Sequence, residues 1–559
     1  MPTDSTPASA ASPPPEDQSR PASRGGKREV WSGQTAFILA AIGSAVGLGN
    51  IWRFPGEAYD NGGGAFMIPY LVALITAGIP ILFLENGIGH RFRGSAPLAF
   101  RRISRRAEGV GWWHVAICFV IGLYYTVIIA WALSYFFFSF DLAWAGDPAG
   151  FFNDEYLQLG EVGVGLDFVP GVLIPLAAIW AVAIVVLALG VAHGVEKLNV
   201  IGIPLLVVTF GILVVRALML DGAAQGVEAL FTPDFSALTN PDVWIAAYGQ
   251  VFFSLSLAYG VMLTYASYRQ RRSNLTGPAL VVAFGNSSFS LLAGLGVFAT
   301  LGFLAAREGV AVADLEGIAG VQLSFVTFPA VIAQMPGGQW FGALFFASLV
   351  IAGLTSLISV LQSVSSALQD KFAWSPRRGA LTVGLTSATL SIVLFGTTTA
   401  LYVLDVVDQW SNQVGIVAGA VAMIAATLWF GRRGRELARH LSVLSSMKVG
   451  LGWLVVVNAV AVLLVYMLVD TTVRLATEGY DGYPGWFVLV FGWGAVAVLL
   501  VAALVMPLAR WRRKPDDFVP WPSPAQLDAP ARAGATGASA GPQGGPQGGS
   551  PTTEDGGER

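Results

Sequence analysis

Charged residues are scarce in this chain of 559 residues. Asp, Glu, Lys and Arg together make up 12% of the sequence, whereas a soluble globular protein carries about 25%. Hydrophobic residues make up 54%, and the mean hydropathy is +0.63. The lack of charge excludes an ordinary soluble protein and indicates an integral membrane protein.

Reactive side chains are scarce as well, which excludes several kinds of site. The single cysteine, Cys118, stands in an apolar run, so we expect neither a disulfide framework nor a cysteine-based metal site. The four histidines show no metal-ligand spacing and no nucleophile stands beside a base, which argues against an enzyme. The net charge of −3 gives no sign of a nucleic-acid partner, and we expect none.

Long apolar runs are missing from both ends of the chain. Residues 1–27 are rich in Pro, Ser and Ala and lack the apolar core of a signal peptide, which predicts a disordered tail. Residues 515–559 include a low-complexity stretch and are expected to form a second disordered tail.

Between the ends lie twelve apolar segments, and a helix needs about 20 mostly apolar residues to span a bilayer. We therefore predict an all-α, multi-pass membrane protein with twelve transmembrane helices surrounded by lipid. The expected spans are residues 33–59, 65–90, 111–139, 169–190, 196–220, 242–270, 277–305, 339–369, 379–398, 400–430, 449–470 and 485–509.

Basic residues occur in alternate loops. Basic runs such as HRFRGSAPLAFRRISRR and RWRRK follow the second, sixth, eighth, tenth and twelfth segments, whereas the loop after the third has acids and no Lys or Arg. Cytoplasmic loops are enriched in Lys and Arg, so both termini are predicted to be cytoplasmic, in a protein of the cell membrane. A set of nucleic-acid patches is the alternative, which the alternation disfavours.

Two of the apolar segments are interrupted by small and polar residues. The first contains GSAVGLGNIWRF, residues 43–54, and the sixth contains residues 254–260. A break exposes backbone groups that hydrocarbon cannot satisfy, so we expect a ligand, an ion or a water-filled cavity at each. Interrupted helices at matching positions of two repeats indicate a transporter site, whereas glycines that only allow close helix packing are the alternative.

The run REVWSGQTAFILAAIGSAVGLGNIWRFPGEAYDNGGGAFMIPY resembles the opening of the sodium:neurotransmitter symporters, the family of the bacterial leucine transporter. The resemblance continues through GQVFFSLSLAYG, AGLTS and LDVVDQW, over about residues 28–430. It implies the fold known for that family, with helices 1 and 6 unwound at mid-membrane in two inverted five-helix repeats. The implied divisions are residues 28–220 and 241–430 for the repeats and 449–509 for helices 11 and 12.

The resemblance implies two bound sodium ions held by oxygen ligands. The residues implied for the first are Ala45, Asn50, Ser254 and Asn286, with the carboxylate of the substrate, and those for the second are Gly43, Val46, Ala352, Thr355 and Ser356. In AGLTS the last three of these share one helix face. By itself, a Thr-Ser pair in a membrane helix usually bonds its own backbone.

The resemblance also implies a substrate pocket. Its expected lining is Ala45, Leu48, Gly49, Ile121, Tyr125, Phe253, Ser254, Ser256, Tyr259, Ser356 and Val360. Monoamine carriers of the family have an aspartate where this chain has Gly47, so the substrate is expected to bring its own carboxylate, as an amino acid does. The largely apolar lining favours a neutral side chain, and Ala258 and Tyr259, which differ from the leucine transporter, leave the amino acid open.

Charged residues inside membrane segments are costly and usually functional. By resemblance, Arg53 and Asp408 close an outer gate above the rings of Tyr125 and Phe253, with Asp405 as a weaker candidate. Arg28 and Asp370 form an inner gate, packed near Trp31 and Tyr268. A static salt bridge is the alternative for each pair. Glu85 is interpreted as a partner of the unwound part of helix 6, or as a protonated structural carboxyl.

Helix 7 lacks a carboxylate that chloride-independent members of the family place near the first sodium. The run GNSSFSLLAG has Ser290 there, as chloride-dependent members do. The other implied chloride contacts are Tyr70, Gln250, Ser254 and Asn286. Buried sodium charges need compensation, so a bound chloride is predicted, with Glu85 or a coupled proton movement as the rival.

The sequence thus predicts a sodium-coupled symporter that imports a neutral amino acid by alternating access. A non-transporting amino-acid sensor of the same fold and a channel are the alternatives. The expected assembly is a monomer or a weak dimer.

Overall fold

The computed structural model describes residues 29–523, apart from residues 234, 316, 317, 319, 446, 516, 517 and 519. Most of the two expected disordered tails therefore lies outside the described residues, as does Arg28. The chain divides into two units, residues 1–518 and 519–559. All the helices described below belong to the first unit.

Helices make up the architecture of the described residues, whose only β pairing is two isolated bridges. The helices of the first half are α1 (Gln34–Ala45), α2 (Phe54–Asp60), α3 (Met67–Ala73), α4 (Ile79–Phe92), α5 (Ala96–Ile103), α6 (Glu108–Phe138), α7 (Pro148–Gly150), α8 (Pro170–Ala188), α9 (Glu196–Leu218), α10 (Ala223–Phe231), α11 (Pro241–Ser254) and α12 (Val261–Ser267). Those of the second half are α13 (Thr276–Glu308), α14 (Gly320–Gln322), α15 (Phe328–Gln334), α16 (Gly338–Phe372), α17 (Pro376–Phe395), α18 (Ala400–Trp410), α19 (Val417–Ile424), α20 (Gly434–Val443), α21 (Leu451–Thr477), α22 (Gly485–Phe487) and α23 (Gly494–Val505).

Ten helical segments among the described residues are long and apolar enough to cross a membrane. An eleventh is the pair Gln34–Ala45 and Gly49–Asp60, bent by 57°. The expected sixth span is divided into α11 and α12, each shorter than a bilayer requires. The all-helical membrane fold is confirmed, whereas the count of twelve spans and the inverted repeats stay predictions.

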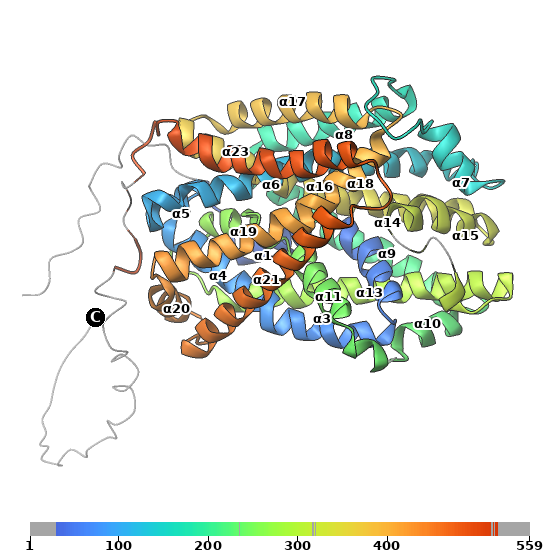
Figure 1. Ribbon diagram of the computed structural model, residues 1–559, viewed down its shortest axis with the longest axis horizontal. Coiled ribbons are helices and arrows are strands. Elements are labelled where there is room, and N and C mark those ends of the chain that lie inside the picture. The colour runs from blue at the N-terminus through green and yellow to red at the C-terminus, as the bar shows by residue number, and fades with distance from the viewer. Residues whose placement is uncertain are drawn as a thin grey trace, which may run out of the picture. The chain divides into compact units, whose positions relative to one another are not determined.

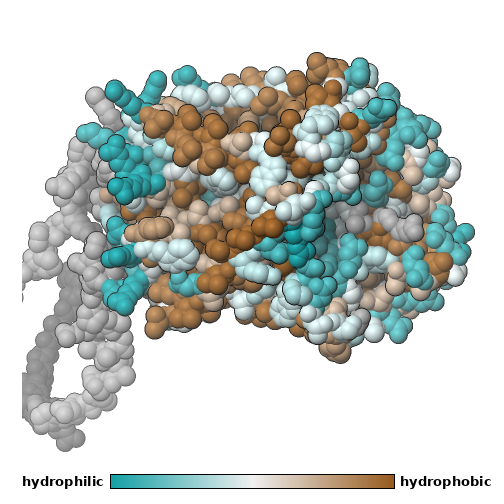
Figure 2. Space-filling view, in the orientation of Figure 1, coloured by the Kyte–Doolittle hydropathy of each residue, from teal (hydrophilic) through white to brown (hydrophobic). Residues whose placement is uncertain are grey.

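Hydrophobic side chains cover the middle of the face that Figure 2 shows, with hydrophilic ones toward its two ends. Inside, α6 and α16 pack along each other, and α1 lies against α9, α13 and α16 (Figure 1). Helix α1, the first part of the broken span, is therefore surrounded by other helices.

Both expected helix interruptions are present. Helix α1 ends at Ala45, and the chain becomes helical again at Gly49 in a π-helical turn that continues into α2. Between α11 and α12, Ser256, Ala258 and Gly260 have φ angles of +52°, +65° and +79°. The left-handed region is costly for residues that carry a Cβ, so the surrounding structure must hold this segment in place.

Glu85 of α4 provides one such contact, as the sequence analysis expected. Its Oε1 accepts a hydrogen bond from the backbone N–H of Ala258 at 3.1 Å, and the residue is fully buried. Cys118 of α6 contacts the same segment, with its thiol donating to the Tyr259 carbonyl at 3.0 Å. Side chains of two other helices thus satisfy backbone groups of the break.

A buried cluster of charges joins the ends of several helices. Lys371 of α16 pairs with Glu108 of α6 at 2.6 Å, and Arg101 of α5 pairs with the same carboxylate at 2.7 Å. The Trp511 indole N–H donates to both carboxylate oxygens at 3.0 Å. The segment after α23 is thereby fastened to α5, α6 and α16.

Replacing Glu85 tests whether its carboxylate holds the break. Glu85→Ala leaves the Ala258 N–H without its acceptor, which costs about 1–3 kcal/mol. We expect a lower unfolding temperature in detergent for Glu85→Ala and a nearly unchanged one for Glu85→Gln, which keeps an acceptor oxygen. Equal losses in the two variants would show that this hydrogen bond is not what stabilises the segment.

Replacing Glu108 tests the charge cluster. Because Lys371 is fully buried, Glu108→Leu leaves its ammonium group unpaired, a loss of about 3–5 kcal/mol. The double variant Glu108→Leu, Lys371→Met removes both charges and is expected to recover part of the lost thermal stability. A double variant that unfolds at a lower temperature than the single one would contradict this account.

Candidate functional site

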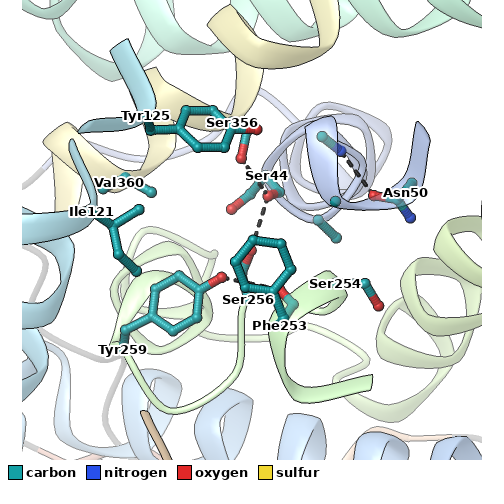
Figure 3. A pocket seen from close by; sticks show the side chains of 13 residues that line it. Ser44, Asn50, Ile121, Tyr125, Phe253, Ser254, Ser256, Tyr259, Ser356 and Val360 are labelled. Atoms are coloured by element: carbon teal, nitrogen blue, oxygen red, sulfur yellow. Dashed lines mark hydrogen bonds between the residues drawn. The ribbon is translucent and has the colours of Figure 1, made fainter. Parts of the chain in front are cut away.

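The two helix breaks face each other across a pocket (Figure 3). Its lining is Ser44, Ala45, Gly47, Gly49, Asn50, Ile121, Tyr125, Phe253, Ser254, Ser256, Tyr259, Ser356 and Val360. All the expected substrate residues line it except Leu48, whose backbone N–H donates to the Tyr125 hydroxyl at 3.0 Å. The structure therefore brings the predicted set together from α1, α6, α11, α16 and the two breaks.

Ser44 is a pocket residue that the sequence analysis missed. Its carbonyl accepts hydrogen bonds from the hydroxyls of Ser256 at 2.9 Å and Ser356 at 3.1 Å. These bonds tie the end of α1 to the second break and to α16. The only signal in the sequence is that Ser44 lies next to two expected ligands, Gly43 and Ala45.

Side chains are excluded at two glycines of the first break. A Cβ at Gly47 would lie 2.6 Å from the Tyr125 hydroxyl, and one at Gly49 would lie 2.2 Å from the Phe253 ring. The Gly47 N–H donates to the Asn50 side-chain oxygen at 2.9 Å. The pocket wall here is bare backbone with a phenol beside it.

The residues expected for the first sodium form one buried cluster. The Asn50 amide donates to Ser290 Oγ at 2.7 Å and to the Asn286 side-chain oxygen at 2.9 Å. In this orientation the Asn286 side-chain oxygen lies 3.1 Å from the Ala45 carbonyl oxygen and 3.2 Å from that of Ser254. When the amide is reversed it donates to both carbonyls, but its nitrogen then faces the Asn50 nitrogen at 2.9 Å. In each orientation of the Asn286 amide, therefore, at least one pair of like groups faces each other: oxygens in the first and nitrogens in the second.

The residues expected for the second sodium lie on α1 and α16 and at the start of the first break. Thr355 Oγ1 donates to its own helix, at 3.1 Å to the Ile351 carbonyl and 3.0 Å to that of Ala352. Ser356 bonds to Ser44, beside the expected Gly43, and all the expected residues are buried. Because α1 packs against α16, the ligands expected from these two helices for the second sodium lie on neighbouring elements.

The residues expected for chloride adjoin the first cluster. Tyr70 donates to Ser287 Oγ at 3.0 Å, and the Gln250 amide donates to the Gly49 carbonyl at 3.1 Å. The side-chain oxygen of Gln250 is buried and has no hydrogen-bond partner among the described residues. Ser254, Asn286 and Ser290 belong to the sodium cluster described above, so one network holds both expected ion groups.

A larger cavity of about 260 Å³ lies next to the pocket, whose own cavity is about 20 Å³. Arg53 lines the larger cavity, with its guanidinium 4.8 Å from the centre of the Phe253 ring and 3.8 Å from Asp408. Tyr125 and Phe253 line both cavities. The expected outer gate residues are thus gathered where the pocket meets the larger cavity.

Two acidic residues near this gate refine the expectation. Glu57, which the sequence analysis missed, lies 3.5 Å from Arg53 in an i, i+4 pair on one helical stretch, a spacing visible in the sequence. Asp405, the weaker candidate, instead accepts hydrogen bonds from Tyr480 at 3.0 Å and Tyr483 at 3.1 Å. Of the two expected candidates, Asp408 is therefore the one that pairs with Arg53, alongside Glu57.

Three of the four expected inner gate residues are described, and all three are buried. The Trp31 indole donates to the Tyr265 carbonyl at 3.0 Å, and its backbone N–H donates to the Tyr268 carbonyl at 3.1 Å. Asp370 accepts from the Ser95 N–H at 2.8 Å. The pairing of Arg28 with Asp370 stays a prediction because Arg28 is outside the described residues.

The sequence profile of the sodium:neurotransmitter symporter family matches residues 28–147 and 145–514. An uncharacterised sodium-dependent transporter of Methanocaldococcus jannaschii is 40% identical over 491 residues, which cover 86% of this chain and 96% of the relative. The sodium-dependent serotonin transporter of Drosophila melanogaster is 31% identical over 522 residues, 86% of this chain and 82% of the relative. The chain therefore belongs to the sodium:neurotransmitter symporter family, whose members are sodium-dependent membrane transporters and not enzymes.

Proposed function

We propose that this transporter couples the uptake of a neutral amino acid to sodium by alternating access, with a chloride ion beside the first sodium. The observation that carries the proposal is the bare backbone at Gly47 and Gly49, which faces a pocket whose other lining side chains are uncharged. A site of this kind suits a ligand that has its own charged backbone groups and a neutral side chain.

The carboxylate of the substrate is proposed to bind at the first break. Backbone N–H groups freed at a helix break attract anions. The Tyr125 hydroxyl accepts from the Leu48 N–H, which leaves its own hydrogen to donate to a carboxylate. The aspartate of monoamine carriers is absent at Gly47, where a Cβ would lie 2.6 Å from the Tyr125 oxygen.

Crowded oxygens support the first sodium site. With the Asn286 oxygen directed toward the carbonyls of Ala45 and Ser254, three oxygens lie together, and the Asn50 amide donates to that of Asn286. A cation among them removes this conflict, and it leaves Asn50 free to keep its bond to Ser290. The substrate carboxylate would complete the ligand set, so that binding of the two is mutually dependent.

The second sodium is proposed to lie between the end of α1 and α16. The Thr355 hydroxyl donates its hydrogen to carbonyl groups of its own helix, so the lone pairs of its oxygen remain available to a cation. Ser356 is shared with the substrate pocket, where it bonds to Ser44. The two sodium sites are therefore joined through the pocket.

Chloride is proposed to compensate the buried sodium charge. Tyr70, Gln250 and Ser290 all offer hydroxyl or amide hydrogens, and α13 has no carboxylate before its last residue, Glu308. The nearest alternative, Glu85, bonds to Ala258 in the second break. Its engagement there favours chloride as the compensating charge.

Two closures are proposed to alternate. Arg53 and Asp408, with the rings of Tyr125 and Phe253, would shut the pocket from outside, and the N-terminal segment with Trp31 and Asp370 would shut it from inside. The protein would lie in the cell membrane with both termini in the cytoplasm. A channel or a non-transporting sensor is the second candidate, although a channel has no use for two closures.

Ion replacement in proteoliposomes tests the coupling. Uptake of radiolabelled neutral amino acids is expected to stop when choline replaces sodium and to fall when gluconate replaces chloride. Ser290→Glu supplies a fixed negative charge and is expected to restore uptake without chloride, whereas Ser290→Ala is not. Uptake that ignores sodium would refute symport, and a wild type indifferent to chloride would refute the chloride site alone.

The Tyr125 hydroxyl tests the carboxylate site. Removal of one hydrogen bond to a charged group costs about 1.5–3 kcal/mol, so Tyr125→Phe is expected to raise KM for the amino acid by about 10- to 150-fold. The matched control is Tyr124→Phe, because Tyr124 is the neighbouring phenol of α6 and lines the larger cavity but not the pocket. Similar KM values for the two variants would place the carboxylate elsewhere.

A further inference from the structure

An apolar groove lies on the outside of the helical body, away from the substrate pocket. It has a volume of about 630 Å³ and runs between α6, α16, α17 and α23. Its floor includes Trp112, Val115 and Ala116, which are buried, whereas wall residues such as Val498 and Val501 of α23 are exposed. We call this hollow the α23 groove; α17 and α23 lie beside each other in Figure 1.

The length of the α23 groove matches one leaflet of a bilayer. Its residues on the α23 side run from Ala497 to Met506, which at 1.5 Å per residue is about 14 Å. The hydrocarbon core of a bilayer is about 30 Å thick, so one leaflet supplies chains of about this reach. The groove therefore has the size and chemistry for a single acyl chain.

One end of the groove is basic. Arg378 stands four residues before the wall residue Thr382 and so lies on the same stripe of α17. Arg510 follows Met506 by four residues, just beyond the end of α23. Both arginines are exposed, and neither forms an ion pair with an acidic residue of the described chain. Their charge is available to an anion from the membrane surface.

The buried charge cluster around Glu108 lies at this basic end of the groove. Glu108 lies one turn before Trp112, Lys371 three residues after the groove residue Leu368, and Trp511 next to Arg510. Glu108 is bound by Lys371, Arg101 and Trp511, so this carboxylate does not pair with Arg378 or Arg510. The charge of the two arginines is therefore not cancelled by Glu108.

We propose that the α23 groove binds an anionic phospholipid, with one acyl chain in the hollow and the phosphate at Arg378 and Arg510. The loop charges are expected to place this end in the cytoplasm, where the leaflet carries anionic lipid. A lipid chain can follow a hollow between helices, whereas the rigid face of a second copy would leave it unfilled. The bound chain would fasten α23, whose outer face is exposed, to α6.

Photo-crosslinking tests the acyl chain. The full chain in nanodiscs would receive phosphatidylglycerol with a diazirine in its acyl chain, and crosslinked peptides would be mapped by mass spectrometry. We expect crosslinks at the groove floor on α6, near Ala116 and Phe119, that excess unlabelled phosphatidylglycerol suppresses at least fivefold more than phosphatidylcholine does. Crosslinks confined to the outer face of α23 would overturn the proposal without any variant.

Substitutions then separate the parts of the site. Ala502→Trp fills the groove and is expected to abolish the α6 crosslinks, whereas Leu504→Trp, on an exposed position of the same helix outside the groove, should keep them. The pair Arg378→Gln, Arg510→Gln should keep crosslinks but reduce the preference for phosphatidylglycerol to about onefold. The proposal would be contradicted by crosslinks that persist in Ala502→Trp, or by a preference for phosphatidylglycerol that persists in the double variant. It would also be contradicted if Ala502→Trp, but not Leu504→Trp, caused a loss of dimers.

Discussion

Backbone groups that a helix break releases inside hydrocarbon must find partners, and the centre of this protein is built around that requirement. An unpaired peptide group in such surroundings costs several kcal/mol. Polar side chains from other parts of the fold therefore pair with the backbone at each break. Tyr125 accepts from Leu48, and Glu85 accepts from Ala258. The hydroxyls of Ser256, in the second break, and Ser356 donate to the Ser44 carbonyl. These contacts fix where the helices meet, and so they define the pocket.

The partners are incomplete at one place, and that place coincides with the proposed ion site. Around Asn286 one orientation of the amide gathers three oxygens, and the reverse one brings its nitrogen to the Asn50 nitrogen, whereas the backbone groups of Leu48, Ala258 and Ser44 have side-chain partners. A protein that needed only stability would place one donor there. An unsatisfied spot of this kind suits a reversible ligand, because the ligand must be able to leave without disrupting the fold.

Much of this arrangement could be predicted from the sequence, for local reasons. Glycines and small polar residues inside apolar segments mark the breaks, and the resemblance over residues 28–430 assigns nearly all of the pocket. The contacts that could not be predicted join residues far apart. Ser44 binds through its carbonyl, which no side-chain pattern reveals, and Trp511 reaches Glu108 across 403 positions. The break in the sixth segment also leaves pieces too short to count as spans by length.

The crowding at Gly47 has a consequence for how such carriers diverge. A change from amino acids to amines would place an acidic side chain at this position, yet its first carbon would lie 2.6 Å from the Tyr125 oxygen. That phenol also holds the Leu48 N–H. Under the proposed function, the Tyr125 ring would have to shift away from Leu48 and from the substrate carboxylate before an acidic side chain fits there. Divergence along this route would therefore require a second change that repositions Tyr125, so paired substitutions are expected rather than single ones.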